Sequence, residues 1–284
     1  MMYNTETLID SGGNFAKDNV DDNGPNCDGY TVQNTCRSFL DGPPRVRPTS
    51  PPTVSMSPTA AADKRVRFYA MGDTPYNAGE HLLLVDQVLR LSKDEAEFVV
   101  HVGDMQRRYG YCGNATYEIV RNTLQGGKLP TFITPGDNDW YDCSDYAEAL
   151  ERFNFYFGDL DQTWPHNFAV QYQAARRENF LFLHKEVMFA SLHVARASHF
   201  KGYEELNART NDNLAWLRHA IRSHTSVCMV LFCHAFPLLP HYETFYNGLV
   251  ALANEYNKPI LYIQGDYHVW HVDRPFTEAQ NIQR

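Results

Sequence analysis

The chain has 284 residues and a formal net charge of -9. This length allows one large domain or two small ones, with enough residues for a buried core. The excess of acidic residues argues against a broad nucleic-acid-binding surface, which needs clustered lysine and arginine. It does not exclude small or metal-bridged anionic substrates. No apolar run reaches the roughly 18 residues that span a bilayer, so no transmembrane segment is predicted.

Residues 1–64 differ in composition from the rest of the chain. They hold seven of the fifteen prolines and little hydrophobic periodicity, so they cannot bury enough apolar surface to offset the entropy of ordering. We predict a disordered or low-complexity segment over 1–64 and a folded domain over 65–284. The first residues lack the basic, apolar and small-residue pattern of a secretory signal. The chain is therefore either intracellular or lacks its natural beginning, and its location stays unknown.

From residue 65 the chain alternates strand-like and helix-like segments. Apolar residues at helical spacing predict helices, and short β-rich apolar runs predict strands. In chain order we expect strand 66–71, helix 79–92, strand 97–102, helix 114–125, strand 131–134, helix 146–158, strands 179–184 and 187–195, helix 211–224, strand 226–233, helix 243–257 and strand 259–264. Such alternation implies an α/β domain with a largely parallel sheet covered by helices. The two consecutive strands without a helix between them suggest an added antiparallel part.

Polar residues directly follow the strand-like runs. A Gly-Asp pair ends "RFYAMGD", "FVVHVGD", "TFITPGD" and "ILYIQGD", and a fifth run, "VCMVLFCH", ends in a histidine. Such residues are also common in ordinary turns. In open α/β sheets, however, functional sites lie beyond the carboxyl ends of the strands, where several loops converge. We therefore expect one cluster of strand-end side chains: Asp73, Asp104, Asp137, His234, Asp266 and His268.

Four carboxylates in one crevice would raise each other's pKa unless positive charge were present. A pair of divalent cations would supply that charge. Mixed carboxylate and imidazole ligation favours zinc, manganese or iron over calcium, which prefers oxygen ligands alone. The six cysteines match no CxxC zinc spacing, so carboxylates and imidazoles are the expected ligands.

The motifs "GDTPY", "VGDMQ", "PGDND", "FCH" and "GDYH", which span roughly residues 66–275, resemble those of the calcineurin-like metallophosphoesterases. That family, which includes the purple acid phosphatases, has Asp-x-His, Gly-Asp, Gly-Asn-His, a lone His and Gly-His-x-His in the same order. The resemblance implies a two-sheet sandwich flanked by helices, with four layers in the order αββα. It also implies a dinuclear metal centre of Mn, Fe or Zn that hydrolyses small phosphate esters, with a metal-activated water as the nucleophile.

The resemblance assigns a role to each ligand. Asp104 matches the carboxylate that bridges both ions. Asp73 and His268 match ligands of the first ion, and the remaining three fall where the second ion is held: Asp137, His234 and Asp266.

The chain departs from the family pattern at two important positions. Pro75 stands where the first motif supplies a histidine ligand, and proline cannot replace it. Tyr76 is either a substitute ligand or a packed aromatic residue. Asn138 occupies the position of the family's substrate-facing histidine, and an amide cannot deliver a proton near neutral pH. The alternative function is therefore a catalytically impaired metal-binding or regulatory protein on the same scaffold.

Other residues near the motifs have two interpretations each. His101, His271 and Asp139 lie close enough in sequence to compensate for the missing histidine, although a buried core role suits His101 better. Asp139 is also expected to support a ligand or cap the turn. Trp140 and Tyr141 either wall the cleft or belong to the core.

Arg107 and Arg108 either clamp phosphate oxygens or form a solvated charged loop. Cys112 and Cys143 each lie a few residues beyond a motif, so their loops are expected at the same edge of the sheet. A disulfide between them would favour a secretory setting, as does the sequon that begins at Asn114.

Overall fold

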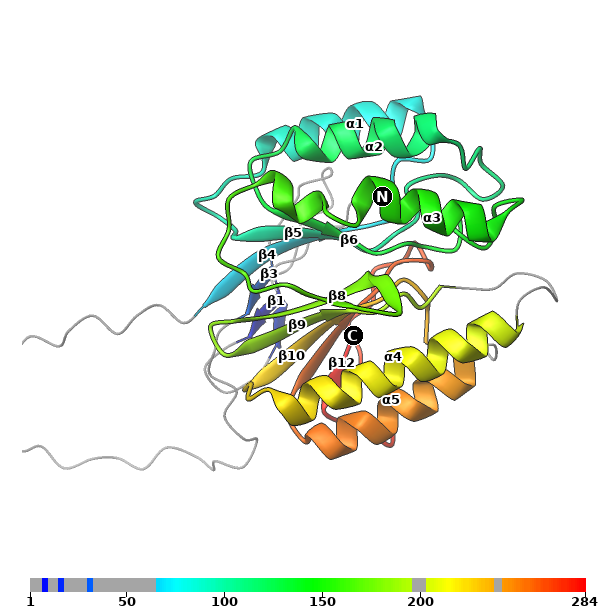
Figure 1. Cartoon of the computed structure of the whole chain (residues 1–284). Coiled ribbons are helices and arrows are strands. Elements are labelled where there is room, and N and C mark those ends of the chain that lie inside the picture. The colour runs from blue at the N-terminus through cyan, green and yellow to red at the C-terminus, as the bar shows by residue number, and fades with distance from the viewer. Residues whose placement is uncertain (1–6, 10–14, 18–29, 33–64, 196–202, 238–241) are drawn as a thin grey trace, which may run out of the picture.

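The computed structural model describes residues 7–9, 15–17, 30–32, 65–195, 203–237 and 242–284. Within these residues the strands form two six-stranded sheets with helices on their outer faces, as Figure 1 shows. The prediction of an α/β fold is confirmed. Within segment 1–64 the structure describes three short stretches, residues 7–9, 15–17 and 30–32, which form strands. The rest of the segment lies outside the described residues, so its disorder stays a prediction.

The first sheet has the strand order β2-β1-β3-β4-β5-β6. The strands are β1 (Thr7–Ile9), β2 (Phe15–Lys17), β3 (Tyr30–Val32), β4 (Val66–Met71), β5 (Phe98–His101) and β6 (Thr131–Ile133). Strands β4, β5 and β6 are parallel, and β3 pairs antiparallel with β4. The connecting helices are α1 (Ala78–Arg90), α2 (Asn114–Gln125) and α3 (Tyr146–Phe157).

The second sheet has the order β12-β11-β10-β9-β8-β7. It contains β7 (Gln171–Gln173), β8 (Arg176–His184), β9 (Val187–Ser191), β10 (Cys228–Phe232), β11 (Ile260–Ile263) and β12 (Ile282–Gln283), with the short helix η1 (Leu160–Thr163) before it. Helices α4 (Tyr203–Ser223) and α5 (Glu243–Tyr256) link β9, β10 and β11, which are parallel. The hairpin of β8 and β9 is the antiparallel part that the sequence suggested.

Three hydrophobic clusters separate the layers. One lies between the sheets and joins residues of β4, β5 and β6 to residues of β8–β11. At its centre Phe98 stacks on Phe68, with ring centroids 5.3 Å apart, and meets Phe189 edge-on at 5.0 Å. The second cluster lies between the first sheet and α1–α3, and the third between the second sheet and α4–α5. Because both faces of each sheet are covered, the central strands consist mostly of apolar residues.

The helix termini follow from local sequence. Asn77 caps α1 by accepting a hydrogen bond from the Glu80 amide at 3.0 Å, and Asp145 caps α3 by accepting from the Glu148 amide at 2.9 Å. The C-terminal end of α5 is capped by Asn257. This residue adopts the left-handed backbone conformation that is common at helix C-termini.

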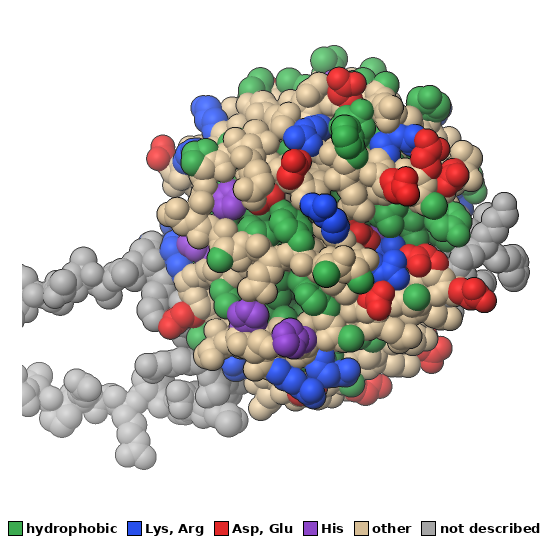
Figure 2. Space-filling model, viewed as in Figure 1, with side chains coloured by type: hydrophobic (Ala, Val, Ile, Leu, Met, Phe, Trp, Pro, Cys, Tyr) green, Lys and Arg blue, Asp and Glu red, His purple; other side chains and the backbone are tan. Residues whose placement is uncertain are grey.

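Charged side chains lie mostly on the surface. Figure 2, drawn from the same side as Figure 1, shows acidic, basic and hydrophobic side chains interspersed over this face. Exposed pairs such as Arg218 with Glu255, 3.4 Å apart, contribute little to stability. No helix in the described ranges has the length and apolarity that crossing a membrane requires.

Candidate metal centre

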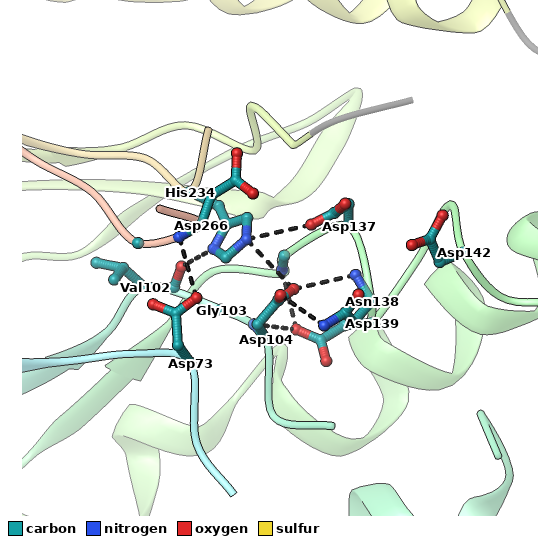
Figure 3. Close-up of polar contacts among 12 residues, drawn as sticks. Asp73, Val102, Gly103, Asp104, Asp137, Asn138, Asp139, Asp142, His234 and Asp266 are labelled. Carbon is teal, nitrogen blue, oxygen red and sulfur yellow. Dashed lines mark hydrogen bonds and ion pairs between the residues drawn. The ribbon is translucent and has the colours of Figure 1, made fainter. Parts of the chain in front are cut away.

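The predicted ligands converge at the carboxyl ends of the parallel strands. Asp73, Asp104 and Asp137 follow β4, β5 and β6, whereas His234 follows β10. The Nε2 atom of His234 lies 3.3 Å from a carboxylate oxygen of Asp104 and 3.3 Å from one of Asp137. Figure 3 shows these side chains turned toward one another.

Asp266 and His268, which follow β11, also belong to the cluster. The backbone amide of Asp266 donates to Asp73 Oδ1 at 3.0 Å, and His268 Nε2 lies 3.0 Å from the same oxygen. Ligand atoms of Asp266, Asp137 and His234 lie within 4.8 Å of one another, as do those of Asp73, Asp104 and His234. Two groups of three that share an imidazole are thus within reach of two ions.

The backbone at these positions is unusual. Asp73, Asp104, Asp266 and His268 have φ values of 55°, 58°, 70° and 52°. Non-glycine residues rarely adopt this left-handed conformation, which costs on the order of 1–3 kcal/mol where the surroundings enforce it. Four of the six predicted ligands therefore carry backbone strain of the kind that clusters at functional sites.

Glycines allow the strand ends to approach closely. A Cβ atom at Gly136 would lie 2.0 Å from Asp104 Oδ1, and one at Gly265 would lie 2.6 Å from Asp73 Oδ2. Since any larger residue would collide with a ligand, the glycine of the Gly-Asp pair is a packing requirement at these two positions.

The tautomer of His234 is fixed by its surroundings. Its Nδ1 atom lies 2.7 Å from the carbonyl oxygen of Val102, which can only accept, so Nδ1 carries the proton. In the neutral ring, the fully buried Nε2 then presents a lone pair toward the oxygens of Asp104 and Asp137, without a hydrogen bond. Positive charge, either a second proton on this ring or a metal ion bound by Nε2 and the carboxylates, removes this repulsion of lone pairs.

The electrostatics lead to the same requirement. Burial raises the pKa of Asp104 to about 6, against the attraction of His234 and with the added repulsion of Asp137 and Asp73. The pKa of His234 lies well above its ordinary value, because the attraction of Asp104 and Asp137 outweighs the opposing effect of burial. With four carboxylates and two imidazoles as donors, this buried site fits transition-metal ions better than calcium.

Asn138 faces Asp104. Its backbone amide donates to Asp104 Oδ1 at 3.0 Å, and its side-chain Nδ2 donates to Asp104 Oδ2 at 2.6 Å and to the carbonyl of Gln106 at 2.9 Å. These contacts hold the carboxylate of Asp104 in place. They occupy the amide that the sequence suggested for substrate.

Asp139 supports the loops. Its carboxylate accepts from the backbone amides of Asp104 at 2.7 Å, Met105 at 2.9 Å and Gly136 at 2.9 Å. Burial and the charge of Asp104 raise the pKa of this fully buried carboxyl to about 7. Asp139 therefore ties the second motif to the third.

The remaining sequence candidates lie around this centre. Arg107 is exposed in the loop after Asp104, and Arg108 pairs with buried Asp142 at 2.9 Å. His271 is exposed, with its ring 5.7 Å from that of Tyr267.

The core interpretation holds for three other residues. His101 is buried, with Nε2 donating to the carbonyl of Thr74 at 2.9 Å and Nδ1 accepting from Gly103 at 3.1 Å. Trp140 and Tyr141 are also buried and belong to one hydrophobic cluster. The interpretation of His101 as a core histidine is confirmed, and the two aromatic residues pack behind the site.

Comparisons with known proteins give no sequence match and only weak likeness to solved structures. No family model and no curated protein sequence matches the chain. A similar solved structure, the "Crystal structure of 5'-nucleotidase from Candida albicans SC5314", is 14% identical with a TM-score of 0.40, and the match covers 71% of this chain and 42% of that one. The chain thus spans less than half the length of that protein. A likeness of this size carries no argument about function.

The site includes a residue that sequence reasoning undervalued. The Tyr76 hydroxyl lies within hydrogen-bonding distance of Asp73, Asp104 and His268. Burial and the charges of Asp104 and Asp73 raise its pKa above the ordinary value of tyrosine. The only sequence signal was its place one residue after Pro75, where the family's ligand is missing.

A disulfide joins the loops of the second and third motifs. Cys112, just before α2, is bonded to Cys143, which lies between β6 and α3. The predicted pairing is confirmed, and it is compatible with an extracellular setting.

A pocket opens beside the centre. Its lining includes Asp73 and His268 together with apolar residues such as Val102, Ile263 and Trp270. A group attached to a metal-bound anion would have room here.

Proposed function

We propose that this protein is a metal-dependent phosphoric ester hydrolase, a phosphatase or phosphodiesterase of the calcineurin-like metallophosphoesterase type. The site would hold two ions of manganese, iron or zinc. Their ligands are those expected from the motifs: Asp73, Asp104, Asp137, His234, Asp266 and His268.

One observation carries this proposal. The buried Nε2 of His234 faces two carboxylates at 3.3 Å, with Asp73 and Asp266 close by, an arrangement that bound cations stabilise. The strained backbone of four of the ligands supports a functional site at the same place.

The arrangement of layers supports the family assignment. Clusters between the two sheets and on their outer faces fit the αββα sandwich that the motifs imply. The motifs also lie at the ends of the expected strands, in the expected order.

Residues of this chain would hold the ions and orient the substrate. Bound divalent ions supply Lewis-acid charge for the phosphoryl oxygens and lower the pKa of a water that attacks phosphorus. Asp104 would bridge the two ion sites while Asn138 orients its carboxylate through two hydrogen bonds. Asp139 would hold the loops of the second and third motifs in place through its bonds to their backbone amides. Arg107, which is exposed, would bind the substrate phosphate from the solvent side of the site.

The substrate would be a small phosphate ester. The pocket beside Asp73 and His268 is lined by both polar and apolar residues, which suits an ester whose leaving group is partly apolar. An aryl phosphate has this character and a leaving group that needs little protonation.

Hydrolysis of a nitrophenyl phosphate after reconstitution with Mn²⁺, Fe²⁺ or Zn²⁺ tests the proposal. We expect turnover that depends on added metal and is lost on chelation. Asp104→Asn should lower kcat/KM by more than about 100-fold, since even residues that only support metal ligands contribute about 10- to 100-fold. Asp86→Asn, the same change at an exposed carboxylate on α1, is the control. Turnover unaffected by chelation and by Asp104→Asn would refute the proposal.

A second candidate function rests on Asn138. Because its amide is bonded to Asp104 and to the carbonyl of Gln106, no general acid stands at this position. A metal-binding protein without appreciable hydrolysis would share this site. Stoichiometric metal binding without turnover of the aryl phosphate would favour that alternative.

A further inference from the structure

The pocket beside the metal centre is lined by residues of both sheets. Ala70 of β4 and Ile263 of β11 line it, and both belong to or pack against the hydrophobic cluster between the sheets. Trp270, two residues after His268, packs against the same cluster and also lines the pocket. Because Asp73 and His268 are part of the lining too, one molecule would contact bound ions and the apolar residues together.

Arg284, which follows β12, brings a buried guanidinium to this pocket. Its side chain is 5% exposed, and its Nε and Nη2 atoms donate to the carboxylate of Asp273 at 3.0 Å and 2.6 Å. The guanidinium also lies over the ring of Phe236, 4.7 Å from the centroid. The third nitrogen, Nη1, is buried and has no hydrogen-bond partner among the residues that the structure describes. Its N–H groups therefore lack an acceptor.

Gln264, which follows β11, contributes an acceptor to the same lining. Its Nε2 atom donates to the carbonyl oxygen of Gly265 at 3.3 Å. Its Oε1 atom is buried and accepts no hydrogen bond within the described part of the chain. Buried polar atoms are nearly always hydrogen-bonded. An unsatisfied donor and an unsatisfied acceptor on residues that line one pocket therefore point to a ligand that supplies both partners.

The charges narrow the class of that ligand. Asp273 already balances the charge of Arg284, so Nη1 suits a neutral carbonyl oxygen, whereas a second carboxylate would place an uncompensated negative charge in a buried site. The Oε1 atom of Gln264 can only accept, so it needs an N–H or O–H group. An amide group holds a carbonyl oxygen and an N–H side by side.

We propose that this pocket binds the alcohol part of the phosphate ester, and that this part carries an amide group on an apolar body. Arg284 Nη1 donates to the amide carbonyl, Gln264 Oε1 accepts from the amide N–H, and the apolar lining around Trp270 covers the rest. Arg284 and Gln264 then determine which ester is selected without taking part in its hydrolysis. This inference rests on the proposed function, because bound ions hold the phosphate end of the substrate.

Calorimetric binding of two benzylphosphonates to the zinc-loaded protein tests the inference. Phosphonates are not hydrolysed, so the measurement needs no turnover. One compound carries an acetamido group opposite the phosphonate arm, and the other carries an isobutyl group of the same shape. We expect the wild-type protein to bind the acetamido compound at least about 10-fold more tightly, which is the contribution of one hydrogen bond to a charged group.

Matched variants locate the preference. Arg284→Lys keeps a positive charge beside Asp273 but removes Nη1, so the ratio of the two affinities should fall close to one. Gln264→Met, which removes the acceptor, should lower the ratio as well. Arg222→Lys, the same change at an exposed arginine that pairs with Glu255, should keep the wild-type ratio.

Elemental analysis of the same samples separates the possible failures. Equal affinities of zinc-loaded wild-type protein for the two compounds, or no binding of either, would overturn the inference and leave the hydrolase proposal to its own assay. A preference that survives in both Arg284→Lys and Gln264→Met would also overturn it. No bound zinc in the wild-type protein would overturn both proposals. The wild-type comparison decides the question even if a variant fails to fold.

Discussion

At the scale of single residues, the centre depends on carboxylates with different tasks. Asp104 turns its oxygens toward His234, Asn138 and Tyr76, where an ion would lie. Asp139, 35 residues further along, turns its oxygens toward backbone amides instead. Both are buried aspartates in Gly-Asp-type loops, and only their neighbours distinguish a ligand from a structural support.

Asp139→Asn should destabilise the fold. The amide group of asparagine would place N–H donors against backbone amides that need an acceptor, at a cost of about 1–3 kcal/mol. Urea unfolding of the metal-free protein measures this cost. Asp159→Asn, at an exposed site, is the control and should change stability little. An Asp139→Asn variant as stable as the wild type would show that the three amides do not depend on this carboxylate.

At the scale of elements, the loops that follow β5 and β6 form one unit. Asp139 bonds to the amides of Asp104 and Met105, and Gln106 Nε2 donates to the carbonyl of Asn138 at 3.1 Å. The Cys112–Cys143 disulfide adds a covalent link over a sequence separation of 31. Together with the hydrogen bonds of Asn138 to Asp104 and Gln106, these contacts hold the second and third motifs to each other.

Removal of the disulfide should lower the unfolding free energy by about 3–4 kcal/mol, as loop-closure entropy predicts for a loop of this length. The measurement compares denaturant unfolding of the wild type with that of the Cys112→Ala/Cys143→Ala double variant. A reductant should destabilise the wild type and leave the double variant unchanged. Equal stability of the two proteins under oxidising conditions would contradict the expectation.

The sequence predicted the elements that have a strong pattern. Apolar runs followed by Gly-Asp indicated β4, β5, β6 and β11, and helical periodicity indicated all five α-helices. The short strands β1, β2, β3, β7 and β12 were not predicted, because two or three residues carry no periodic signal.

The sequence indicated which residues come together at the site, but not which hydrogen bonds they make there. Strand-end positions placed Asp73, Asp104 and Asp137 at an edge of the first sheet and His234, Asp266 and His268 at an edge of the second, because parallel strands of a sheet end together. The meeting of the two edges at one site is a tertiary feature. The part played by Tyr76 depends on how α1 begins, and the direction in which Asn138 points depends on Asp104 and Gln106. These features are tertiary, and no local pattern encodes them.

At the scale of the whole molecule, a buried polar network lies behind the third motif. Glu178 of β8 bonds to His193 at 3.1 Å and to Arg209 of α4, and the Arg209 guanidinium lies over the Trp140 ring at 4.6 Å. Burial and the charge of Arg209 lower the pKa of His193 to about 3. The network thus connects the second sheet, α4 and the loop of the third motif, and it keeps His193 neutral.

The neutral state of His193 predicts acid sensitivity. Its folded pKa of about 3 lies below its ordinary value of 6.5, so between these values the unfolded chain binds the proton and the folded chain does not. This contribution to stability is present above pH 6.5 and is lost as the pH falls, by up to about 1.4 kcal/mol per pH unit. His193→Gln should flatten the plot of unfolding free energy against pH in this window. An unchanged slope in the variant would contradict the assignment.

The account depends most on the claim that the strand-end cluster binds metal. Anomalous scattering from crystals grown with Mn²⁺ or Zn²⁺ tests this claim directly. We expect two strong peaks, one among Asp73, Asp104 and His268 and one among Asp137, His234 and Asp266. An absence of peaks at both places, in crystals of the folded protein at saturating metal, would contradict the account.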